Sequence, residues 1–212
     1  MTETTFQPIA YARLNALAPD FAARSTNGPI TLSSYRGRWV VFFAHPANFT
    51  PVCTSEFIAL ARASPDFEKL DCALLGLSVD SLYSHIAWIR DIRERFGINV
   101  AFPLVEDPSM AIAKAYGMID GTSDSSATVR ATYVIDPEGI IRAIVWYPMN
   151  VGRSVDELLR LVAALQSAER ENAAAPEGWR PGNPLLEHAP SSEGEETVLH
   201  PGESWYFRER HT

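Results

Sequence analysis

Cys53 stands in the segment Thr50-Pro51-Val52-Cys53, where a helix is expected to begin. Thr50 has the side chain of an N-cap, and Pro51 suits the first helical position because its missing N–H would have no partner there. Cys53 then falls in the first turn, among unpaired amides at the positive end of the helix dipole. This environment favours the thiolate, the nucleophilic form of cysteine. The segment indicates redox or covalent chemistry, although a free cysteine is also often only a small buried residue.

Cys72 is the other of the two cysteines in the chain, and its setting is different. It opens the apolar run 73–79, which predicts a strand, and no cap, proline or basic residue adjoins it. We interpret Cys72 as a packing residue. Two cysteines outside any short-spaced motif are typical of a reducing compartment, and they disfavour a thiol-transfer protein of the thioredoxin kind.

A thiolate that attacks the O–O bond of a peroxide needs hydrogen-bond donors and a cation to stabilise the charge that develops on the leaving oxygen. Thr50 can turn its hydroxyl toward the sulfur, and it can also act as a simple helix cap. Arg130 precedes an apolar run, and its guanidinium suits a thiolate or a peroxide oxygen. His45 could orient Glu56 or a peroxide, or be a structural group. Pro46 could fix the loop that shields the sulfur.

The bulk composition excludes several functional classes. A net charge of −8 argues against a nucleic-acid surface, and the scattered histidines form no metal-binding pattern. The absence of GxxxxGK, GxGxxG and GxSxG patterns counts against nucleotide-driven, Rossmann and serine-hydrolase activities. Residues 1–10 show no signal peptide, and no apolar run is long enough to span a bilayer. We therefore expect a cytoplasmic protein without a membrane partner, metal or cofactor.

Strand and helix patterns alternate along the chain, which predicts an α/β or mixed domain with a central sheet covered by helices. Strands are expected at 39–44, 73–79, 132–135 and 140–147, the last two as a hairpin across the turn 136–139. Four helices are expected. The first runs from 51 to about 63, with a break or kink at Pro65, and the second follows Ser81 with Ile86, Ile89 and Phe96 on its buried stripe. The third runs from Asp107-Pro108 to Tyr116-Gly117, and the fourth follows Ser154 and buries Leu158, Leu161, Val162 and Leu165.

The composition changes near residue 172, after which proline, glycine and glutamate dominate. A disordered tail is one interpretation. Disordered segments are usually poor in aromatic residues, however, and this one is not, so we favour an ordered arm that docks on the core or on a second subunit. Its large apolar residues are Trp179, Leu185, Leu186, Val198, Trp205, Tyr206 and Phe207.

The segment HPANFTPVCTSE, from His45 to Glu56, matches the PxxxTxxC signature of peroxiredoxins and is similar to the peroxiredoxin 6-type, one-Cys branch. Further matches at 77–81, 133–137, 147–148, 152–153 and around Trp179 extend the resemblance over nearly the whole chain. It implies a thioredoxin-like fold, with a peroxidase domain over residues 1–167 and a C-terminal arm over 168–212 for dimerisation. Many members of the family assemble further, from homodimers into decamers.

The resemblance also implies a reaction. Hydrogen peroxide or an alkyl hydroperoxide is reduced to water or alcohol through a cysteine sulfenic acid, which an external thiol then reduces. Excess peroxide would drive the sulfenic acid on to sulfinic acid. Each candidate residue receives a role: Cys53 is the peroxidatic cysteine, Thr50 and Arg130 complete the site, Pro46 shields it, and His45 and Glu56 are the histidine and the acidic residue near the sulfur.

Two departures from the family pattern refine this expectation. The tail segment Trp205-Tyr206-Phe207-Arg208 has no cysteine where some archaeal-type relatives carry one, which favours a one-Cys cycle. Segment 35–39 lacks the serine of members reported to act on phospholipids, so we expect no lipase activity. A peroxide sensor or redox-controlled chaperone is the alternative, and it would consume one peroxide per chain where an enzyme consumes many.

Overall fold

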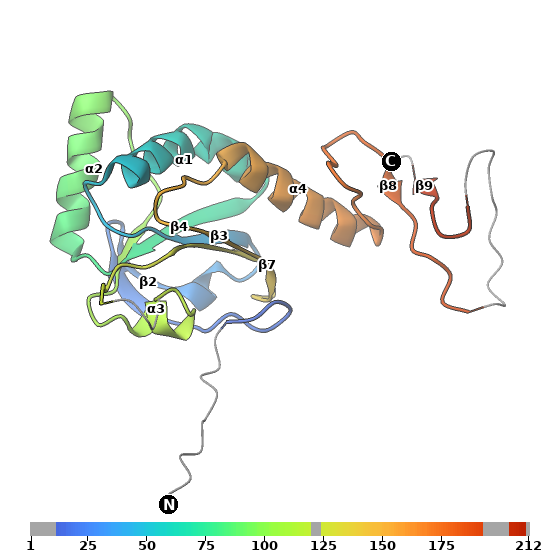
Figure 1. Cartoon of the computed structure of the whole chain (residues 1–212), viewed down its shortest axis with the longest axis horizontal. Coiled ribbons are helices and arrows are strands. Elements are labelled where there is room, and N and C mark those ends of the chain that lie inside the picture. The colour runs from blue at the N-terminus through green and yellow to red at the C-terminus, as the bar shows by residue number, and fades with distance from the viewer. Residues whose placement is uncertain (1–11, 120–123, 193–203, 211–212) are drawn as a thin grey trace, which may run out of the picture. The chain divides into compact units, whose positions relative to one another are not determined.

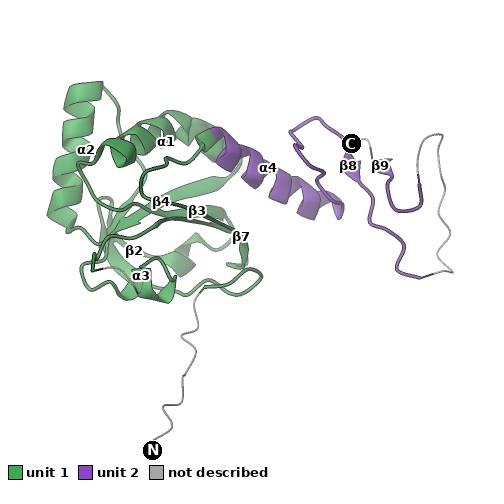
Figure 2. Ribbon diagram, in the orientation of Figure 1, with its two compact units in different colours: residues 1–155 green, residues 156–212 purple. Residues whose placement is uncertain are grey.

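The computed structural model describes residues 12–119, 124–192 and 204–210. Residues 1–10 and Val198, on which expectations were stated above, lie outside these ranges. The chain forms two compact units, residues 1–155 and 156–212 (Figure 2). The second unit therefore includes nearly all of the helix that follows Ser154, whereas the sequence placed the boundary after residue 167.

A mixed sheet of seven strands forms the centre of the first unit, in the order β2-β1-β5-β4-β3-β6-β7. β3 and β5 both pair in parallel with β4, whereas β6 pairs antiparallel with β3 and β7. The predicted hairpin is confirmed, and Gly139 N donates to Asp136 O (2.9 Å) across its turn. The strands are β1 (Ala22–Ser25), β2 (Gly28–Thr31), β3 (Trp39–Ala44), β4 (Cys72–Ser78), β5 (Leu104–Glu106), β6 (Arg130–Ile135) and β7 (Ile141–Tyr147).

Helices lie on both sides of this sheet, and in Figure 1 α1 runs above it and α3 below it. This arrangement confirms the expected α/β, thioredoxin-like fold with a central sheet flanked by helices. The helical elements of the first unit, within the part of the chain that is described, are the 3₁₀ helix η1 (Leu32–Tyr35) and the α-helices α1 (Pro51–Lys69), α2 (Leu82–Phe96) and α3 (Ala111–Ala115).

The central strand β3 is buried along its whole length, as a continuous apolar run predicts for a strand covered on both faces. Phe42 packs against Tyr116 beside α3 (ring centroids 4.9 Å apart), and Phe43 packs against Phe57 of α1 (5.7 Å). Successive side chains of a strand point to opposite faces, so His45 points to the side of Phe43. Its ring lies 4.8 Å from the ring of Phe57, which places it next to α1.

α1 continues through Pro65 to Lys69, so the predicted break is wrong. A proline inside a helix removes one backbone hydrogen bond and costs about 3 kcal/mol. The additional turn buries Phe67, which is 1% exposed, and burial of such a side chain contributes roughly 2–3 kcal/mol. Tertiary packing therefore offsets most of the local cost.

α2 begins and ends as predicted, with Ser81 as the N-cap and Gly97 in the left-handed conformation (φ +66°) at its end. The predicted buried stripe is wrong, because Ile86 and Phe96 are 37% and 51% exposed. The stripe that is buried includes a polar side chain, and a count of apolar residues therefore misses it. Its members are His85, Trp88 and Ile92.

α3 begins at Ala111 rather than at Pro108. The carboxylate of Asp107 accepts hydrogen bonds from Ser109 Oγ (3.2 Å) and Ala113 N (2.8 Å), and Met110 N donates to Asp107 O (2.9 Å). These bonds close a turn ahead of the helix, so the Asp-Pro pair initiates the turn and not the helix.

The second unit contains α4 (Val155–Glu171), which begins at its boundary, and the antiparallel pair β8 (Leu185–Leu186) and β9 (Glu209–Arg210). Trp179 is 4% exposed, and its Nε1 donates to Asn183 O (3.0 Å). The arm is thus ordered wherever it is described. Leu158 and Val162 are buried as expected, but Leu161 and Leu165 line an open groove of about 720 Å³ with residues 175–178 and Arg180. No helix in the described ranges is both long and apolar enough to cross a membrane.

Candidate active site

Cys53 lies in the first turn of α1 and is 0% exposed. The predicted helix start is confirmed, since Thr50 takes the N-cap position (φ −105°, ψ 149°) and Pro51 is the first helical residue. The Thr50 side chain makes no cap hydrogen bond, however, and its hydroxyl donates to Ala47 O (2.9 Å). Its proton is therefore used within the loop, while its oxygen lone pairs can still accept a hydrogen bond.

Arg130 brings a positive charge to the sulfur. Its Nη1 lies 3.3 Å from Cys53 Sγ, and the residue is 2% exposed at the start of β6. Nε and Nη2 both donate to Met149 O (3.0 and 2.7 Å), which fixes the plane of the guanidinium. The structure thus brings together two residues that the sequence linked by chemical type and by the family resemblance, but not by any local pattern.

Glu56 follows Cys53 by one helical turn and binds two arginines. Its Oε2 lies 2.7 Å from Arg130 Nη1 and 2.8 Å from Arg153 Nη2, and its Oε1 accepts from Arg153 N and Nε (2.8 and 2.9 Å). Burial alone would raise the pKa of Glu56, but the hydrogen bonds and charge of Arg153 and the charge of Arg130 lower it below its ordinary value. Glu56 is therefore a buried anion.

Arg153 is a residue of this site that sequence reasoning missed. Its Nη1 donates to Ala44 O at the end of β3 and to Ala131 O of β6 (2.9 and 3.1 Å), and its Cζ lies 5.1 Å from the centre of the Phe43 ring. The sequence resemblance covered this position, but Arg153 stands 97 residues from Glu56 and no local pattern connects them. Only the folded chain brings the two together.

The charged side chains buried around the sulfur do not balance one another. Two guanidinium groups and one carboxylate meet here, which leaves an excess of one positive charge. An unbalanced charge in a buried site is costly, and a negative charge in contact with it recovers much of that cost. The arrangement therefore favours a reaction in which negative charge develops next to the sulfur.

His45 and Pro46 are both buried in the segment that follows β3. The His45 carbonyl accepts from Thr128 Oγ1 (3.0 Å), and its Nε2 lies 2.9 Å from Asn48 Oδ1. Burial lowers the pKa of His45 to about 3, so the ring is neutral at physiological pH. Within the described ranges no hydrogen bond joins His45 to Glu56, so His45 does not orient that carboxylate.

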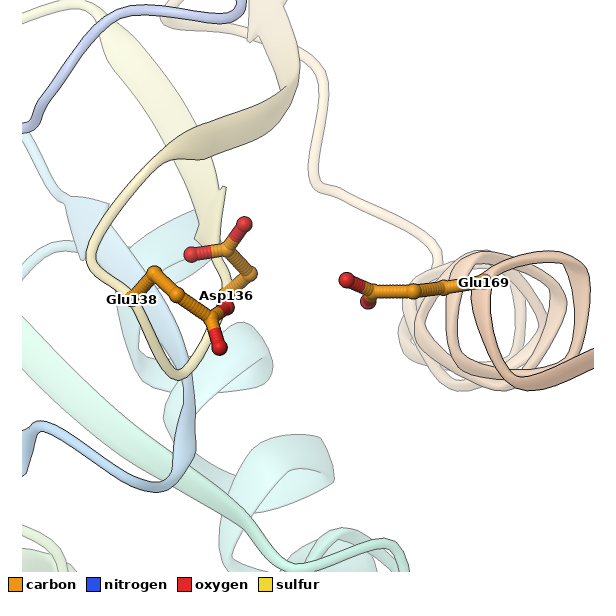
Figure 3. A group of neighbouring side chains, drawn as sticks. All are labelled: Asp136, Glu138 and Glu169. Atoms are coloured by element: carbon orange, nitrogen blue, oxygen red, sulfur yellow. The ribbon is translucent and has the colours of Figure 1, made fainter. Parts of the chain in front are cut away.

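Figure 3 shows three carboxylates, two of them on the turn between β6 and β7. Asp136 is buried, and its oxygens accept from Ile140 N (2.7 Å) and Arg142 Nε (2.6 Å). Its acceptors are thus used to hold the hairpin turn. Glu138 is exposed, and Glu169 belongs to the second unit, so we assign no metal site to this group.

Comparison with known proteins gives matches over most of the chain. The model of the AhpC/TSA family matches residues 14–144. The chain is 47% identical over 198 residues to "Peroxiredoxin 2" of Thermoplasma acidophilum, which covers 90% of this chain and 96% of that protein. It is 49% identical over 174 residues to "Peroxiredoxin" of Aquifex aeolicus, covering 82% and 78% of the two chains.

Solved structures give the same picture. The chain resembles a yeast mitochondrial 1-Cys peroxiredoxin, described with glutathione and thioredoxin systems, with a TM-score of 0.83 and 37% identity over 94% of this chain and 99% of that one. A cysteine-to-serine variant of peroxiredoxin 6 from Arenicola marina gives a TM-score of 0.83 at 29% identity, covering 94% and 97%. A reduced 2-Cys peroxiredoxin of Plasmodium vivax gives 0.75 at 33% identity, covering 82% and 92%.

Proposed function

The chain belongs to the AhpC/TSA family and is a peroxiredoxin, a thiol peroxidase, and from this premise we propose that Cys53 reduces hydrogen peroxide and small alkyl hydroperoxides in a one-Cys cycle. The observation that carries the proposal is the 3.3 Å contact between Arg130 Nη1 and Cys53 Sγ in a fully buried site. A thiolate held next to a guanidinium is both nucleophilic and ready to hand negative charge to a leaving oxygen.

In the proposed step the Cys53 thiolate attacks one peroxide oxygen. An S–O bond forms while the O–O bond breaks, and the electron pair of that bond moves to the leaving oxygen. The sulfur loses two electrons and becomes a sulfenic acid, and the leaving hydroxide or alkoxide takes a proton from solvent. Arg130, whose guanidinium is already aligned by Met149 O, stabilises the charge that builds on that oxygen.

An external thiol completes the proposed cycle. A first thiol condenses with the sulfenic acid, releases water and forms a mixed disulfide; a second displaces Cys53 as thiolate and leaves as a disulfide with the first. Glutathione and thioredoxin are the reductants we propose, since the similar yeast 1-Cys protein is described with these systems.

The position of Cys72 supports the one-Cys form of the cycle. Cys72 pairs with Trp39 at the first residue of β3, whereas Arg153 ties the site of Cys53 to Ala44 at the last. The two cysteines thus lie near opposite ends of a strand that rises about 3.3 Å per residue. Cys72 is also 1% exposed, so it does not reach the Cys53 sulfenic acid in the folded chain.

A pair of serine variants tests the proposal. Cys53→Ser should abolish peroxide consumption with every thiol donor, whereas Cys72→Ser should retain most of it. With one equivalent of peroxide, mass spectrometry after dimedone trapping should find the adduct on Cys53 alone. Turnover by Cys53→Ser would overturn the assignment. Consumption of only one peroxide per chain, with glutathione and thioredoxin both supplied, would favour the sensor alternative.

A homodimer is also part of the proposed function. β7 is an edge strand of the sheet, and Trp146 on it is 54% exposed, so this edge is available for pairing with a second copy. The arm of residues 168–212 offers a further surface, since Trp205, Tyr206 and Phe207 are 58%, 65% and 48% exposed. Sedimentation velocity should give a dimer or decamer that Trp146→Asp weakens; an unchanged assembly would exclude the β7 edge.

A further inference from the structure

A chain of buried polar side chains runs from the end of β3 to α2. His45 Nε2 lies 2.9 Å from Asn48 Oδ1, and Asn48 Nδ2 lies 3.0 Å from His85 Nδ1. His85 Nε2 in turn lies 3.2 Å from Val105 O. The three side-chain residues are all buried, with exposed fractions of 0%, 7% and 0%. Asn48, His85 and Val105 have no role in the reaction step proposed above.

The positions of the protons in this row of hydrogen bonds can be assigned by starting from the carbonyl of Val105. A backbone carbonyl only accepts, so His85 Nε2 must carry the proton that it donates to Val105 O. Burial lowers the pKa of His85, which keeps its ring neutral, so its Nδ1 has a lone pair and no proton. His85 Nδ1 lies 3.0 Å from the amide nitrogen of Asn48 and 3.2 Å from its oxygen. Only the nitrogen can donate, so Asn48 Nδ2 faces His85.

The orientation of Asn48 then decides the tautomer of His45. Its second Nδ2 proton is donated to Ser84 Oγ (2.9 Å), and its backbone N donates to Asp80 Oδ2 (3.0 Å), which holds the residue from two more directions. Asn48 Oδ1 is left as an acceptor toward His45, so His45 Nε2 carries the proton. The Nδ1 atom of the neutral His45 ring is therefore a bare lone pair.

That lone pair is buried and unused by the protein. Across the described part of the chain, His45 Nδ1 has no hydrogen-bond partner. The His45 ring lies against Phe57, and Phe57 follows Cys53 by one turn on the same face of α1. The hydroperoxide substrate and the sulfenic acid product each carry at least one O–H group, and a buried donor of that kind needs an acceptor.

We propose that Asn48 and His85 are positioning residues that hold His45 as its Nε2–H tautomer, so that His45 Nδ1 accepts the hydroxyl of the hydroperoxide and then of the Cys53 sulfenic acid. The inference rests on the proposed function and deepens it. No proton is transferred to His45, which only accepts a hydrogen bond. The amide matters because it has a donor and an acceptor, and a carboxylate or an apolar side chain at position 48 lacks one or both.

The first test reads the protons directly, without any activity measurement. A long-range ¹H–¹⁵N spectrum of the ¹⁵N-labelled full chain distinguishes protonated from bare ring nitrogens. In the reduced protein His45 and His85 should both carry their proton on Nε2, and His45 should stay neutral from pH 5 to 8. A proton on His45 Nδ1, or titration of His45 in this range, would overturn the inference.

The second test uses the near-isosteric variant Asn48→Asp. The new carboxylate can still accept from His45 Nε2 but cannot donate to His85 Nδ1, so His85 should take up a second proton. The titratable and charged groups that act on the two rings are Asp80 and Glu106 for His85, and His85, Asp80 and Arg153 for His45. His85 should then titrate between pH 5 and 8, and the rate of Cys53 oxidation should acquire a pH dependence there. The proposal would be contradicted if, in this variant, the titration of His85 and the pH dependence of Cys53 oxidation were both the same as in the wild type.

Asn48→Leu removes both functions of the amide, and Ser64→Ala, at a position of α1 outside this network, is its control. Asn48→Leu should mix the tautomers of His45 and slow Cys53 oxidation by peroxide about tenfold, the loss expected for one hydrogen bond. Ser64→Ala removes only the hydrogen bond from Ser64 Oγ to Leu60 O (3.0 Å) and should change neither. If Asn48→Leu melts like wild type and keeps both the tautomer and the rate, the proposal fails. If wild-type Cys53 itself does not react with peroxide, the proposed function fails instead, and the spectrum still reports on Asn48.

Discussion

Cys53 and Cys72 are equally buried, but the charged groups around them carry opposite excess charge. Cys53 is 0% exposed and Cys72 is 1% exposed. Near Cys53 two guanidinium groups share one carboxylate, whereas near Cys72 the single guanidinium of Arg38 faces Glu68 (2.6 Å) and Asp71 (3.0 Å). Cys72 Sγ lies 3.9 Å from the carbonyl oxygen of Ala73, and the backbone of Val41 also makes a hydrogen bond with Cys72.

This difference shows that burial alone does not decide whether a cysteine is reactive. Burial raises the pKa of Cys72 to about 12, although a hydrogen bond with the backbone of Val41 and the charge of Arg38 act in the opposite direction; Asp71 and Glu68 add to the increase. At Cys53, Glu56 is the one carboxylate in the described ranges that pairs with Arg130 and Arg153, so positive charge remains in excess. A reactive thiolate therefore depends on the balance of charges that share its site, and each of the following changes tests that dependence.

The largest effect is expected from removing the guanidinium at the sulfur. Arg130→Met should slow Cys53 oxidation by roughly 10²–10³-fold, because it deletes the donor that stabilises both the thiolate and the leaving oxygen. The matched change at the other cysteine, Arg38→Met, should leave the rate within a factor of about two. Stopped-flow measurement of the second-order rate constant checks both. Equal rates for the two variants would refute the contrast between the regions.

Labelling of Cys72 should be slower than that of Cys53 by at least about 100-fold. With its pKa raised to about 12, roughly one Cys72 in 10⁴ is ionised at pH 8, and only the thiolate reacts. Iodoacetamide treatment of the reduced protein, followed by peptide mass spectrometry, gives the two rates. The same experiment in denaturant should make the two cysteines alike, and if they are already alike in the folded protein the contrast fails.

Loss of the carboxylate near Cys53 should destabilise the fold strongly, whereas loss of one near Cys72 should have little effect. Glu56→Gln removes the carboxylate that two buried guanidinium groups share and should lower the free energy of unfolding by about 3 kcal/mol. Glu68→Gln breaks an ion pair whose carboxylate is 71% exposed, and it should cost less than about 1 kcal/mol. Urea unfolding measures both. A similar loss in both variants would show that the buried cluster has no special role.

The smallest expected effect is a pH dependence of the free energy of unfolding, which arises from His45 in the region of Cys53. His45 has a pKa of about 3 when folded and about 6.5 when unfolded, so below pH 6.5 the unfolded chain binds a proton that the folded chain does not. Stability should thus decrease as the pH falls from 6.5, by up to about 1.4 kcal/mol per pH unit. The ordinary pKa of Glu56, 4.5, lies below this pH range, so the histidines dominate the change in stability between pH 5 and 6.

The control for this slope is His45→Gln, which should lower it over the same pH range. The slope that remains belongs to His85, whose pKa burial also lowers. An unfolding free energy that does not change between pH 5 and 6 would show that His45 takes up its proton in the folded chain as easily as in the unfolded one.

Local signals predicted the start of α1 well, because they act within one turn. The N-cap position and the following proline fix where the helix begins, and this alone places Cys53 in its first turn. The same reasoning did not find the far end of α1, where packing of Phe67 overrides Pro65. It also missed the buried face of α2, because one buried position there is the polar His85 and is satisfied by contacts that the sequence does not show.

The sequence by itself determined strands β3, β4, β6 and β7 and the four α-helices, but not β1, β2 and β5. It also determined the peroxiredoxin signature and the candidate for the reactive cysteine, because these depend on patterns within a few neighbouring positions. The tertiary structure decided which charges meet the sulfur. Arg130 and Arg153 arrive from strands and loops far along the chain and share Glu56 with each other. Charges interact through space at a few ångströms, so only folding could reveal that the site holds one positive charge more than its carboxylate can balance.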